Sequence, residues 1–589
     1  MLSSRIITTG TGSNLVTVSA VRGCPQGGVL SPLLWTIVVD DLLHKLSDGG
    51  FEVVGYADDL VIMVRGKVET VICDRMEAAL RLVSSWCKAE GLNVNPSKAV
   101  IVPFTRKYKV SLRDISLNGS TIPFQDSFKY LGVTLDKRLN WNKHISGVTR
   151  RAIRAFWACS GLFGKSWGLS PKMIFWLYTS IIRPIVAYAA VVWWTKVSEK
   201  STQLKLQKVQ RLVCLGMTGA MRTCPTAPIE AIVGIAPLFI FIKKTAASSA
   251  IKMHRQKNYK VSSLSGHLSI LKELGELDKF IYCSDYLPKQ YNFHAKFNII
   301  IPERSDWEEG SFQADDNGLR WYTDGSRMND RSGLGIYGPN CNISLGLGSY
   351  PSVFQAEVLA IHYCALHILS KRMKGGNFYI FSDSQAALKS LKNPEICSKI
   401  VQQCWLTLNE LARGNKITLV WVPGHRGIDG NEKADELARQ GSDTNFIGPE
   451  PFCALPSGAL FSPIKIWEKR TYSDYWDNQV KYRQAKRLIR PLSYKDIHKY
   501  SKNDLRNLTG LLTGHCSLNY HMCKLGIVEL ATCRLCNEED ETSEHILCHC
   551  EAIGRTRLQY LGREYISPFE LWKISPDKIL RFIRKLRIL

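Results

Sequence analysis

Four acidic residues in the second half of the chain have the placement of a metal site built from separate elements. Asp324 and Asp383 each end a predicted strand. Glu357 lies early in one predicted helix, and Asp435 lies in another. Carboxylates from four elements can converge only where a cation or protons offset their repulsion. We therefore expect a site for hard divalent cations such as Mg²⁺, which prefer oxygen ligands.

A second acidic pair, Asp58 and Asp59, lies at the turn of a hairpin predicted over residues 51–64. Paired aspartates suit Mg²⁺, although they are also ordinary turn residues. A Gly/Pro-rich loop at residues 23–35 precedes this hairpin and opens an apolar helix. The combination of the two segments favours a functional role for the acidic turn over turn chemistry alone.

The C-terminal region contains a cluster with the spacing Cys-x2-Cys-x8-His-x4-Cys. Thiolate and imidazole ligands at such spacing suit tetrahedral Zn²⁺. The ligands of this set are Cys533, Cys536, His545 and Cys550. The nearby residues that compete for the same role are Cys548, His549, Cys516, Cys523, His515 and His521. Reduced, buried cysteines without a metal are the alternative.

Length and composition bound the kind of protein that carries these groups. A chain of 589 residues corresponds to about four domains. Its 77 Lys and Arg exceed its 52 Asp and Glu by 25, which favours a nucleic-acid partner. No uncharged apolar run reaches the roughly 20 residues that span a bilayer, and no secretory signal is visible. We therefore expect an intracellular protein of the nucleus and cytoplasm, with reduced cysteines and no membrane contact.

Composition and periodicity divide the chain into five segments. Residues 1–140 alternate β-rich runs with turns, and residues 141–260 have helical spacing. Residues 261–316 lose periodicity, which indicates a linker. Residues 317–442 alternate strands and helices as in an α/β domain, and residues 443–589 form a basic helical region with the Cys/His cluster. The expected fold class is therefore multidomain, combining α+β and α/β parts.

The α/β segment is predicted to run strand, strand, strand, helix, strand, helix, strand, helix. Its helices are expected over residues 354–369, 384–391 and 431–439. A flexible Pro-Gly-His-Arg-Gly loop at residues 423–427 precedes the last helix.

The acidic hairpin and the loop before it resemble the reverse transcriptases of non-LTR retrotransposons of the Jockey and I type. In that family the Pro-Gln-Gly loop lies by the templating pair and the incoming nucleotide. The resemblance implies that Gln26 and Gly27 bind substrate. It also implies that Asp58 is a catalytic Mg²⁺ ligand and that Asp59 is its partner.

Two later motifs extend the resemblance. The string Gly-Leu-Asn-Val-Asn-Pro-Ser-Lys, which ends at Lys98, is similar to the next palm motif, and the resemblance places this lysine near the leaving pyrophosphate. The string Phe-Lys-Tyr-Leu-Gly-Val, with Lys129 and Tyr130, is similar to the primer-grip hairpin.

The family supplies a further catalytic aspartate ahead of the Pro-Gln-Gly loop, whereas residues 1–21 contain no Asp or Glu. Two-metal phosphoryl transfer needs carboxylates from separate strands. We therefore expect a partial palm with a helical thumb that binds a hybrid duplex, with the polymerase activity of the parent element incomplete in this chain.

The acidic residues of the α/β segment lie in strings that, in this order, resemble type 1 ribonuclease H: Thr-Asp-Gly-Ser, Ser-Asp-Ser and Pro-Gly-His…Gly-Asn-Glu…Ala-Asp. The resemblance implies endonucleolytic hydrolysis of RNA in RNA–DNA hybrids at a two-Mg²⁺ site. Its ligands are Asp324, Glu357, Asp383 and Asp435. His425, on the Gly-flanked loop, is expected to move protons as the product leaves.

The Cys/His cluster resembles a motif near the C-terminus of many non-LTR retrotransposon polyproteins, which implies a Zn²⁺ site that holds element RNA or target DNA. The whole chain thus resembles the C-terminal part of such a polyprotein. One alternative is a decayed, non-catalytic nucleic-acid-binding relic, which the four surviving carboxylates disfavour. Another is a cellular ribonuclease H with added basic domains, which the polymerase motifs disfavour.

Overall fold

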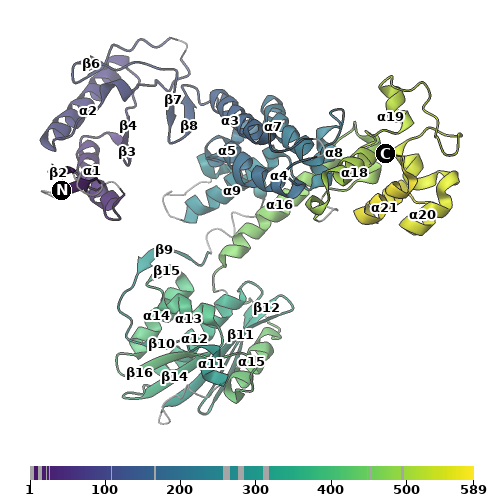
Figure 1. The fold of residues 1–589 in the computed structure, drawn as a ribbon. Coiled ribbons are helices and arrows are strands. Elements are labelled where there is room, and N and C mark those ends of the chain that lie inside the picture. Colours follow the sequence, from purple (N-terminus) through teal and green to yellow (C-terminus); the bar gives the residue numbers. More distant parts are fainter. Residues whose placement is uncertain are drawn as a thin grey trace. The chain divides into compact units, whose positions relative to one another are not determined.

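The computed structural model of the chain (Figure 1) separates into two compact units, Met1–Ser146 and Gly147–Leu589. It describes residues 5–10, 16–20, 23–25, 27–107, 109–164, 167–255, 266–275, 284–308, 318–446, 449–451, 453–491 and 496–588.

The first unit consists of short hairpins and two helices. Its elements are β1 (Arg5–Thr9), β2 (Val16–Ala20), α1 (Ser31–Asp48), β3 (Glu52–Tyr56), β4 (Asp59–Met63), α2 (Glu69–Ala89), β5 (Ser116–Leu117), β6 (Ser120–Thr121), β7 (Ser127–Tyr130) and β8 (Val133–Asp136). Apolar side chains that include Leu46 and Trp86 pack α1 against α2. The antiparallel pair β3–β4 confirms the predicted acidic hairpin, because Tyr56 pairs with Asp59 across the turn.

The second unit begins with helices, as the apolar spacing predicts. These are α3 (Asn142–Ser160), which starts in the first unit, and α4 (Pro171–Leu177), α5 (Arg183–Ala187), α6 (Ala190–Trp193), α7 (Lys200–Thr218), α8 (Thr226–Val233) and α9 (Leu238–Arg255). Every residue of α8 is buried. α8 is buried because it packs between α7, which precedes it in sequence, and α18 (Lys502–Thr513) of the C-terminal region.

The C-terminal region is helical and shares a core with α8. Its helices are α16 (Ser457–Asp477), α17 (Arg483–Leu488), α18 (Lys502–Thr513), α19 (Asn519–Lys524), α20 (Gly554–Leu561) and α21 (Pro576–Leu586). Ala231 and Ile232 of α8 belong to the same buried cluster as Leu508 and Leu511 of α18. Burial of apolar area on this scale is the dominant stabilising contribution, so the two helical regions fold together.

Residues 318–446 form an α/β domain around one mixed sheet, to which β10 (Asn298–Ile300) adds an edge strand, and the strand order is β10-β16-β14-β11-β12-β13. Its elements are β11 (Leu319–Met328), β12 (Arg331–Gly338), β13 (Cys341–Gly348), α12 (Val353–Ser370), β14 (Asn377–Ser382), α13 (Gln385–Lys392), β15 (Glu395–Ser398), α14 (Lys399–Leu411), β16 (Lys416–Trp421) and α15 (Asp429–Ser442). β11 is antiparallel to β12 and parallel to β14, which is parallel to β16. Asp383 directly follows β14, as predicted, whereas Asp324 does not end its strand: it lies within β11, just beyond the last residue of β11 that pairs with β14, and β11 continues to Met328 against β12.

The sequence pattern missed one helix and misassigned one segment. The prediction passed from the helix over 384–391 directly to a strand, whereas β15 and α14 intervene. The buried residues Ile400, Cys404 and Leu408 recur every four positions, a helical signal that was present in the sequence.

The predicted linker over residues 261–316 is also partly structured. Where it is described, this segment holds β9 (Tyr286–Tyr291), which pairs with β15, and β10 (Asn298–Ile300), which adds a parallel edge strand beside β16. The short helix α11 (Arg304–Glu308) follows. Strand pairing between distant segments leaves no local periodicity, so it escaped prediction.

Within the described residues, α12 is long and apolar enough to cross a membrane, and two bent helix pairs, Pro171–Ala187 with Ala190–Ser198 and Thr226–Val233 with Leu238–Arg255, pass the same test together. The core explains the composition of α12, because its apolar residues pack with α14 and the sheet in one buried cluster.

Candidate active site

The α/β domain brings three of its four predicted metal ligands together. One oxygen each of Asp324, Glu357 and Asp383 lies within 4.8 Å of the others. Asp324 is on β11, Glu357 is in the first turns of α12, and Asp383 directly follows β14. Ser384 then caps α13 by accepting a hydrogen bond from the Ala387 amide, which fixes the backbone just after Asp383.

A glycine after Asp324 allows α12 to approach the strand. A Cβ atom at Gly325 would lie 2.4 Å from the amide nitrogen of Glu357, closer than any real Cβ contact. Gly335 does the same for α15, because its Cβ would lie 2.0 Å from the Ala434 carbonyl oxygen. These close approaches set the positions of Glu357 and of the helix that carries Asp435.

The electrostatics of this cluster favour a bound cation. Burial, followed by the charges of Asp383 and Asp435, raises the pKa of Asp324 from 3.8 to about 7. Burial and the neighbouring aspartates likewise raise the pKa of Glu357 well above its usual value. Glu357 Oε2 is buried and has no hydrogen-bond partner. A buried carboxylate oxygen without a hydrogen-bond partner, surrounded by other carboxylates, can act as a ligand for a divalent cation.

Asp435 and His425 border the cluster without joining it as closely. Arg439, one turn along α15, pairs with the Asp435 carboxylate. His425 Nδ1 lies 3.8 Å from Asp435 Oδ2, and its side chain is exposed. His425 has a left-handed backbone with φ +54°, which turns this loop back toward the strand ends.

Asn431 is a site residue that the sequence did not single out. Burial raises the pKa of Asp383, and a hydrogen bond from the Asn431 side chain opposes that shift. Trp421 Nε1 also donates to the Asp383 backbone carbonyl, at 3.0 Å. The Gly-Asn-Glu string contained Asn431, but only the fold shows which aspartate it contacts.

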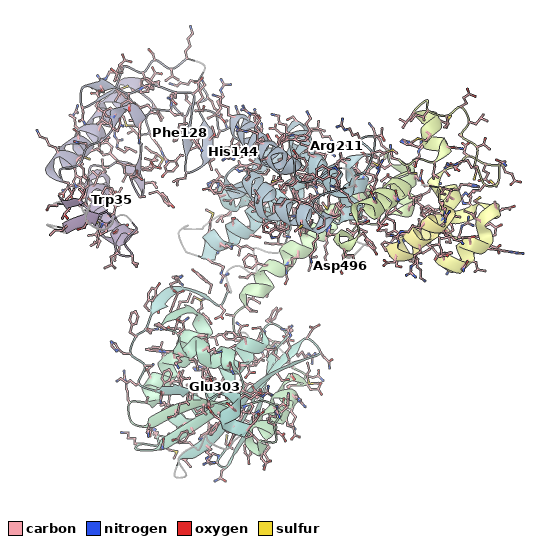
Figure 2. The ribbon with its side chains drawn as sticks, viewed as in Figure 1. Trp35, Phe128, His144, Arg211, Glu303 and Asp496 are labelled. Atoms are coloured by element: carbon pink, nitrogen blue, oxygen red, sulfur yellow. The ribbon has the colours of Figure 1, made fainter. Side chains whose placement is uncertain are left out.

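In the first unit, Asp58 and Asp59 are exposed at the tip of the β3–β4 hairpin. Trp35 of α1, labelled in Figure 2, donates from Nε1 to the Ala57 carbonyl oxygen at 2.8 Å. Ala57 has a left-handed backbone with φ +51°. The helix that follows the Gly/Pro-rich loop therefore supports the acidic turn through one indole hydrogen bond.

The other palm residues have mixed placements. Gln26 lies outside the described residues, whereas Gly27 is exposed with φ +83°. Lys98 and Lys129 are exposed. Tyr130 is half-buried, and burial together with the Asp59 carboxylate raises the pKa of its phenol. The predicted primer-grip hairpin β7–β8 and the acidic hairpin are thus close enough to interact electrostatically.

The C-terminal cluster gathers the predicted zinc ligands. One ligand atom from each of Cys533, Cys536, His545 and Cys550 lies within 4.8 Å of the others. Cys536 Sγ lies 3.3 Å from His545 Nε2. Hydrogen bonds from two backbone amides lower the pKa of Cys536, which favours the thiolate. A second set of possible metal ligands consists of Glu539, His545 and His549, and it shares His545 with the first set.

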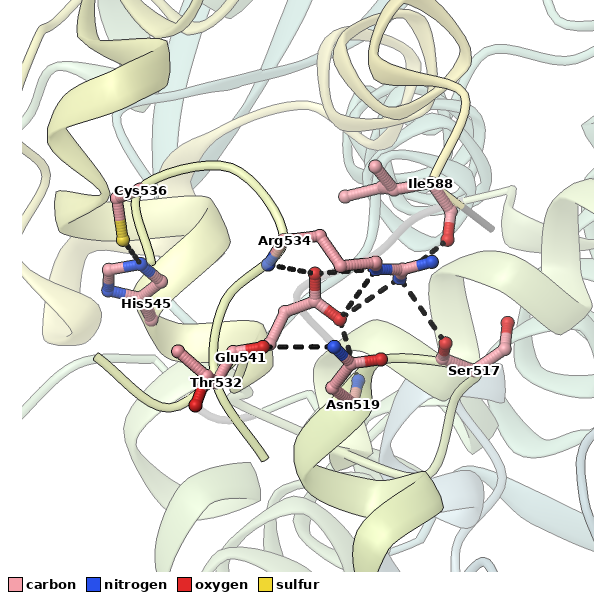
Figure 3. A network of polar contacts seen from close by, with 8 residues as sticks. All are labelled: Ser517, Asn519, Thr532, Arg534, Cys536, Glu541, His545 and Ile588. Carbon is pink, nitrogen blue, oxygen red and sulfur yellow. Dashed lines mark hydrogen bonds and ion pairs between the residues drawn. The ribbon is translucent and has the colours of Figure 1, made fainter. Parts of the chain in front are cut away.

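Acidic residues organise this cluster from outside. Glu539 Oε2 lies 2.8 Å from His545 Nδ1, which leaves Nε2 facing the cysteines. Figure 3 shows Arg534 in a two-pronged ion pair with the fully buried Glu541, with Nε–Oε1 and Nη2–Oε2 distances of 2.9 Å each. Glu541 also accepts from the Asn519 amide at 2.6 Å. The loop between the ligands is therefore held by charge-assisted hydrogen bonds.

Family models match two segments of the chain. Residues 3–135 match the family described as reverse transcriptase (RNA-dependent DNA polymerase), and residues 316–443 match RNase H. The chain carries reverse transcriptase and RNase H domains. The acidic hairpin lies in the first match, and all four predicted acidic ligands lie in the second.

Curated relatives come from retrotransposons. A 115 kDa protein of the element R1DM from Drosophila melanogaster is 29% identical over 243 residues, which cover 41% of this chain and 23% of that protein. An R1 Pol polyprotein from Nasonia vitripennis is 24% identical, with coverage of 40% and 71%. The polymerase of the mobile element jockey from Drosophila melanogaster is 26% identical, with coverage of 35% and 23%. The match thus spans less than a quarter of the first and third of these relatives.

Among solved structures, a foamy viral protease-reverse transcriptase in complex with dsDNA is 23% identical, with coverage of 22% of this chain and 97% of that chain and a TM-score of 0.19. The chain is thus similar to polyproteins of the R1 and jockey retrotransposon type, and two of its segments match the reverse transcriptase and RNase H families.

Proposed function

We propose that the α/β domain hydrolyses the RNA strand of RNA–DNA hybrids in a Mg²⁺-dependent reaction. The observation that carries this proposal is the buried triad of Asp324, Glu357 and Asp383, with Glu357 Oε2 lacking a partner. Three such carboxylates cost stability unless a cation offsets them. This cost also argues against a decayed relic.

The residues of the domain divide the work of the reaction. Asp324, Glu357 and Asp383, with Asp435 beside them, would hold the ions. Bound Mg²⁺ supplies activation of a water and stabilisation of the departing 3′ oxygen in an in-line attack on the phosphodiester. His425 lies on an exposed loop within reach of Asp435. In this proposal the imidazole of His425 moves a proton as the product leaves.

Cleavage of a labelled RNA–DNA hybrid by the full chain tests this proposal. We expect Mg²⁺-dependent cleavage by the wild type and none by Asp383→Asn. Asp330→Asn is the matched control, because the Asp330 side chain is fully exposed in the same domain. Cleavage that survives in Asp383→Asn, or that fails in a folded wild type, would refute the proposal.

The first unit supports a second activity, RNA-directed DNA synthesis by the parent element. The supporting observation is the exposed Asp58–Asp59 turn, which the Trp35 hydrogen bond holds in place. In this proposal Asp58 is a Mg²⁺ ligand with Asp59 beside it. Gln26, Gly27, Lys98, Lys129 and Tyr130 contact the substrates.

The C-terminal cluster is proposed to bind Zn²⁺ through Cys533, Cys536, His545 and Cys550, in support of contacts to element RNA and target DNA. The flanking basic residues and the net charge of +25 support a nucleic-acid partner. With these proposed substrates, we propose that the protein acts in the nucleus and cytoplasm.

A further inference from the structure

A hollow of about 210 Å³ lies beside the loop that carries His425. Its walls combine two guanidinium groups, one carboxylate, an aromatic ring and apolar side chains: Arg304, Trp307, Glu308, Pro423, Arg426 and Ile428. One wall comes from α11, which precedes the segment that matches the RNase H family. The hollow thus lies between α11, outside the matched segment, and three residues within it.

The α11 wall is anchored to the sheet. Trp307 and Ile428 pack against an apolar cluster on β14, on β16 and just after β16, which consists of Tyr379, Phe381, Val420 and Val422. Glu303, labelled in Figure 2, donates its amide to Asp306 Oδ2 at 2.8 Å, which caps the start of α11. The hollow is therefore held in place by two strands of the sheet that positions Asp324 and Asp383.

The opposite wall of the hollow leads to the carboxylates. A Cβ atom at Gly424 would lie 2.7 Å from Asp383 Oδ2, so the loop of Pro423 and Arg426 runs directly beside the site. When the RNA strand of a hybrid lies across the carboxylates, a nucleotide next to the scissile one can reach the hollow.

The charges at the rim suit an anion. Arg426 Nη2 lies 3.5 Å from Glu308 Oε1, and Arg304 Nε lies 4.0 Å from the same oxygen. One carboxylate thus faces two guanidinium groups, and all three side chains are more than half exposed. Exposed pairs of this kind contribute little stability, so a phosphate can displace Glu308 at low cost.

We propose that this hollow holds one nucleotide of the hybrid next to the scissile phosphodiester, with its phosphate between Arg304 and Arg426. The sugar lies against the apolar wall of Trp307, Pro423 and Ile428. The volume is several times the roughly 30 Å³ share of one water in the liquid, which is room for a phosphate and part of its sugar. The proposal rests on the proposed hybrid hydrolysis.

Hybrid binding across a salt series tests the contact, in the full chain carrying Asp383→Asn to prevent cleavage. Arg304→Ala should weaken binding several-fold and reduce the slope of log K against log salt by about 1, as for one lost phosphate contact. Glu308→Gln should tighten binding, because it removes the competing carboxylate. Lys374→Ala is the control, since Lys374 is exposed at the opposite end of β14 and should change neither quantity.

Two results would overturn the proposal. One is an Arg304→Ala chain that binds like Lys374→Ala. The other is a Glu308→Gln chain that binds more weakly than its parent, because the ion pairs would then only stabilise α11. Cleavage by the chain without Asp383→Asn is measured separately, so failure of the hydrolase proposal is distinguishable from failure of this contact.

Discussion

Replacing Asp324 with Asn tests whether repulsion and burial of the triad lower the free energy of unfolding of the protein without metal. Burial and neighbouring carboxylates raise the pKa of Asp324 from 3.8 to about 7. The difference corresponds to about 4 kcal/mol, at 1.36 kcal/mol per pKa unit. Because the folded pKa lies above the unfolded one, the folded state keeps a proton that the unfolded state releases. The free energy of unfolding therefore falls as pH rises from about 4 to 7, then stays constant.

Asn at position 324 does not ionise, so it lacks this pH dependence. Between pH 6 and pH 8 the free energy of unfolding of the wild type should fall by about 1.4 kcal/mol relative to that of Asp324→Asn. This change corresponds to about a tenfold loss of protection against amide hydrogen exchange. The assay is hydrogen–deuterium exchange of β11 and β14 in the full chain with chelator, corrected for intrinsic rates. Added Mg²⁺ should restore protection to the wild type only.

Asp330→Asn controls for the amide substitution and should follow the wild type at both pH values. Equal pH dependence of wild type and Asp324→Asn would refute the argument that burial and repulsion raise this pKa. Equal protection of both by Mg²⁺ would refute the assignment of Asp324 as a ligand.

Three further predictions concern packing, zinc and the acidic turn. Gly325→Ala forces a Cβ atom against the backbone of Glu357. The rate of hybrid cleavage should fall about 100-fold, as expected when a catalytic group is displaced by about 1 Å. An unchanged rate would show that α12 does not need the missing Cβ to approach β11. Cys536→Ser should reduce bound zinc, measured by elemental analysis, from one ion per chain to near zero, whereas Cys523→Ser should retain the ion; equal loss in both would reassign the ligands. Trp35→Phe removes a hydrogen bond that contributes about 1 kcal/mol. Amide hydrogen exchange at the tip of the β3–β4 hairpin should therefore become about fivefold faster. An unchanged exchange rate would show that the indole does not hold the turn.

The sequence was informative where function resides in local strings and regular periodicity. Asp383 precedes the cap residue Ser384, which can be recognised without the fold, and the apolar runs around Asp58 predicted its hairpin correctly. The convergence of Glu357 on Asp324 was expected from the family order, but the steric reason for it, the missing Cβ at Gly325, appears only when α12 lies against β11.

Long-range contacts account for what the sequence did not show. The edge strand β10 and helix α11 gain their stability from β16 and from the apolar cluster on the sheet, so their own residues carry no clear pattern. The hydrogen bond from Trp35 likewise joins segments separated by 22 residues. Spacing alone leaves Cys548 open as a ligand, whereas the structure groups Cys550, and not Cys548, with Cys533, Cys536 and His545.

The central claim, hydrolysis of RNA in a hybrid at the carboxylate triad, is tested most directly by the strand and end groups of the products. Water attack with departure of the 3′ oxygen predicts RNA fragments with 5′-phosphate and 3′-hydroxyl ends, an intact DNA strand and dependence on Mg²⁺. The measurement is mass analysis of products from a hybrid labelled separately on each strand. Cyclic 2′,3′-phosphate ends, or equal cleavage of the DNA strand, would contradict the account.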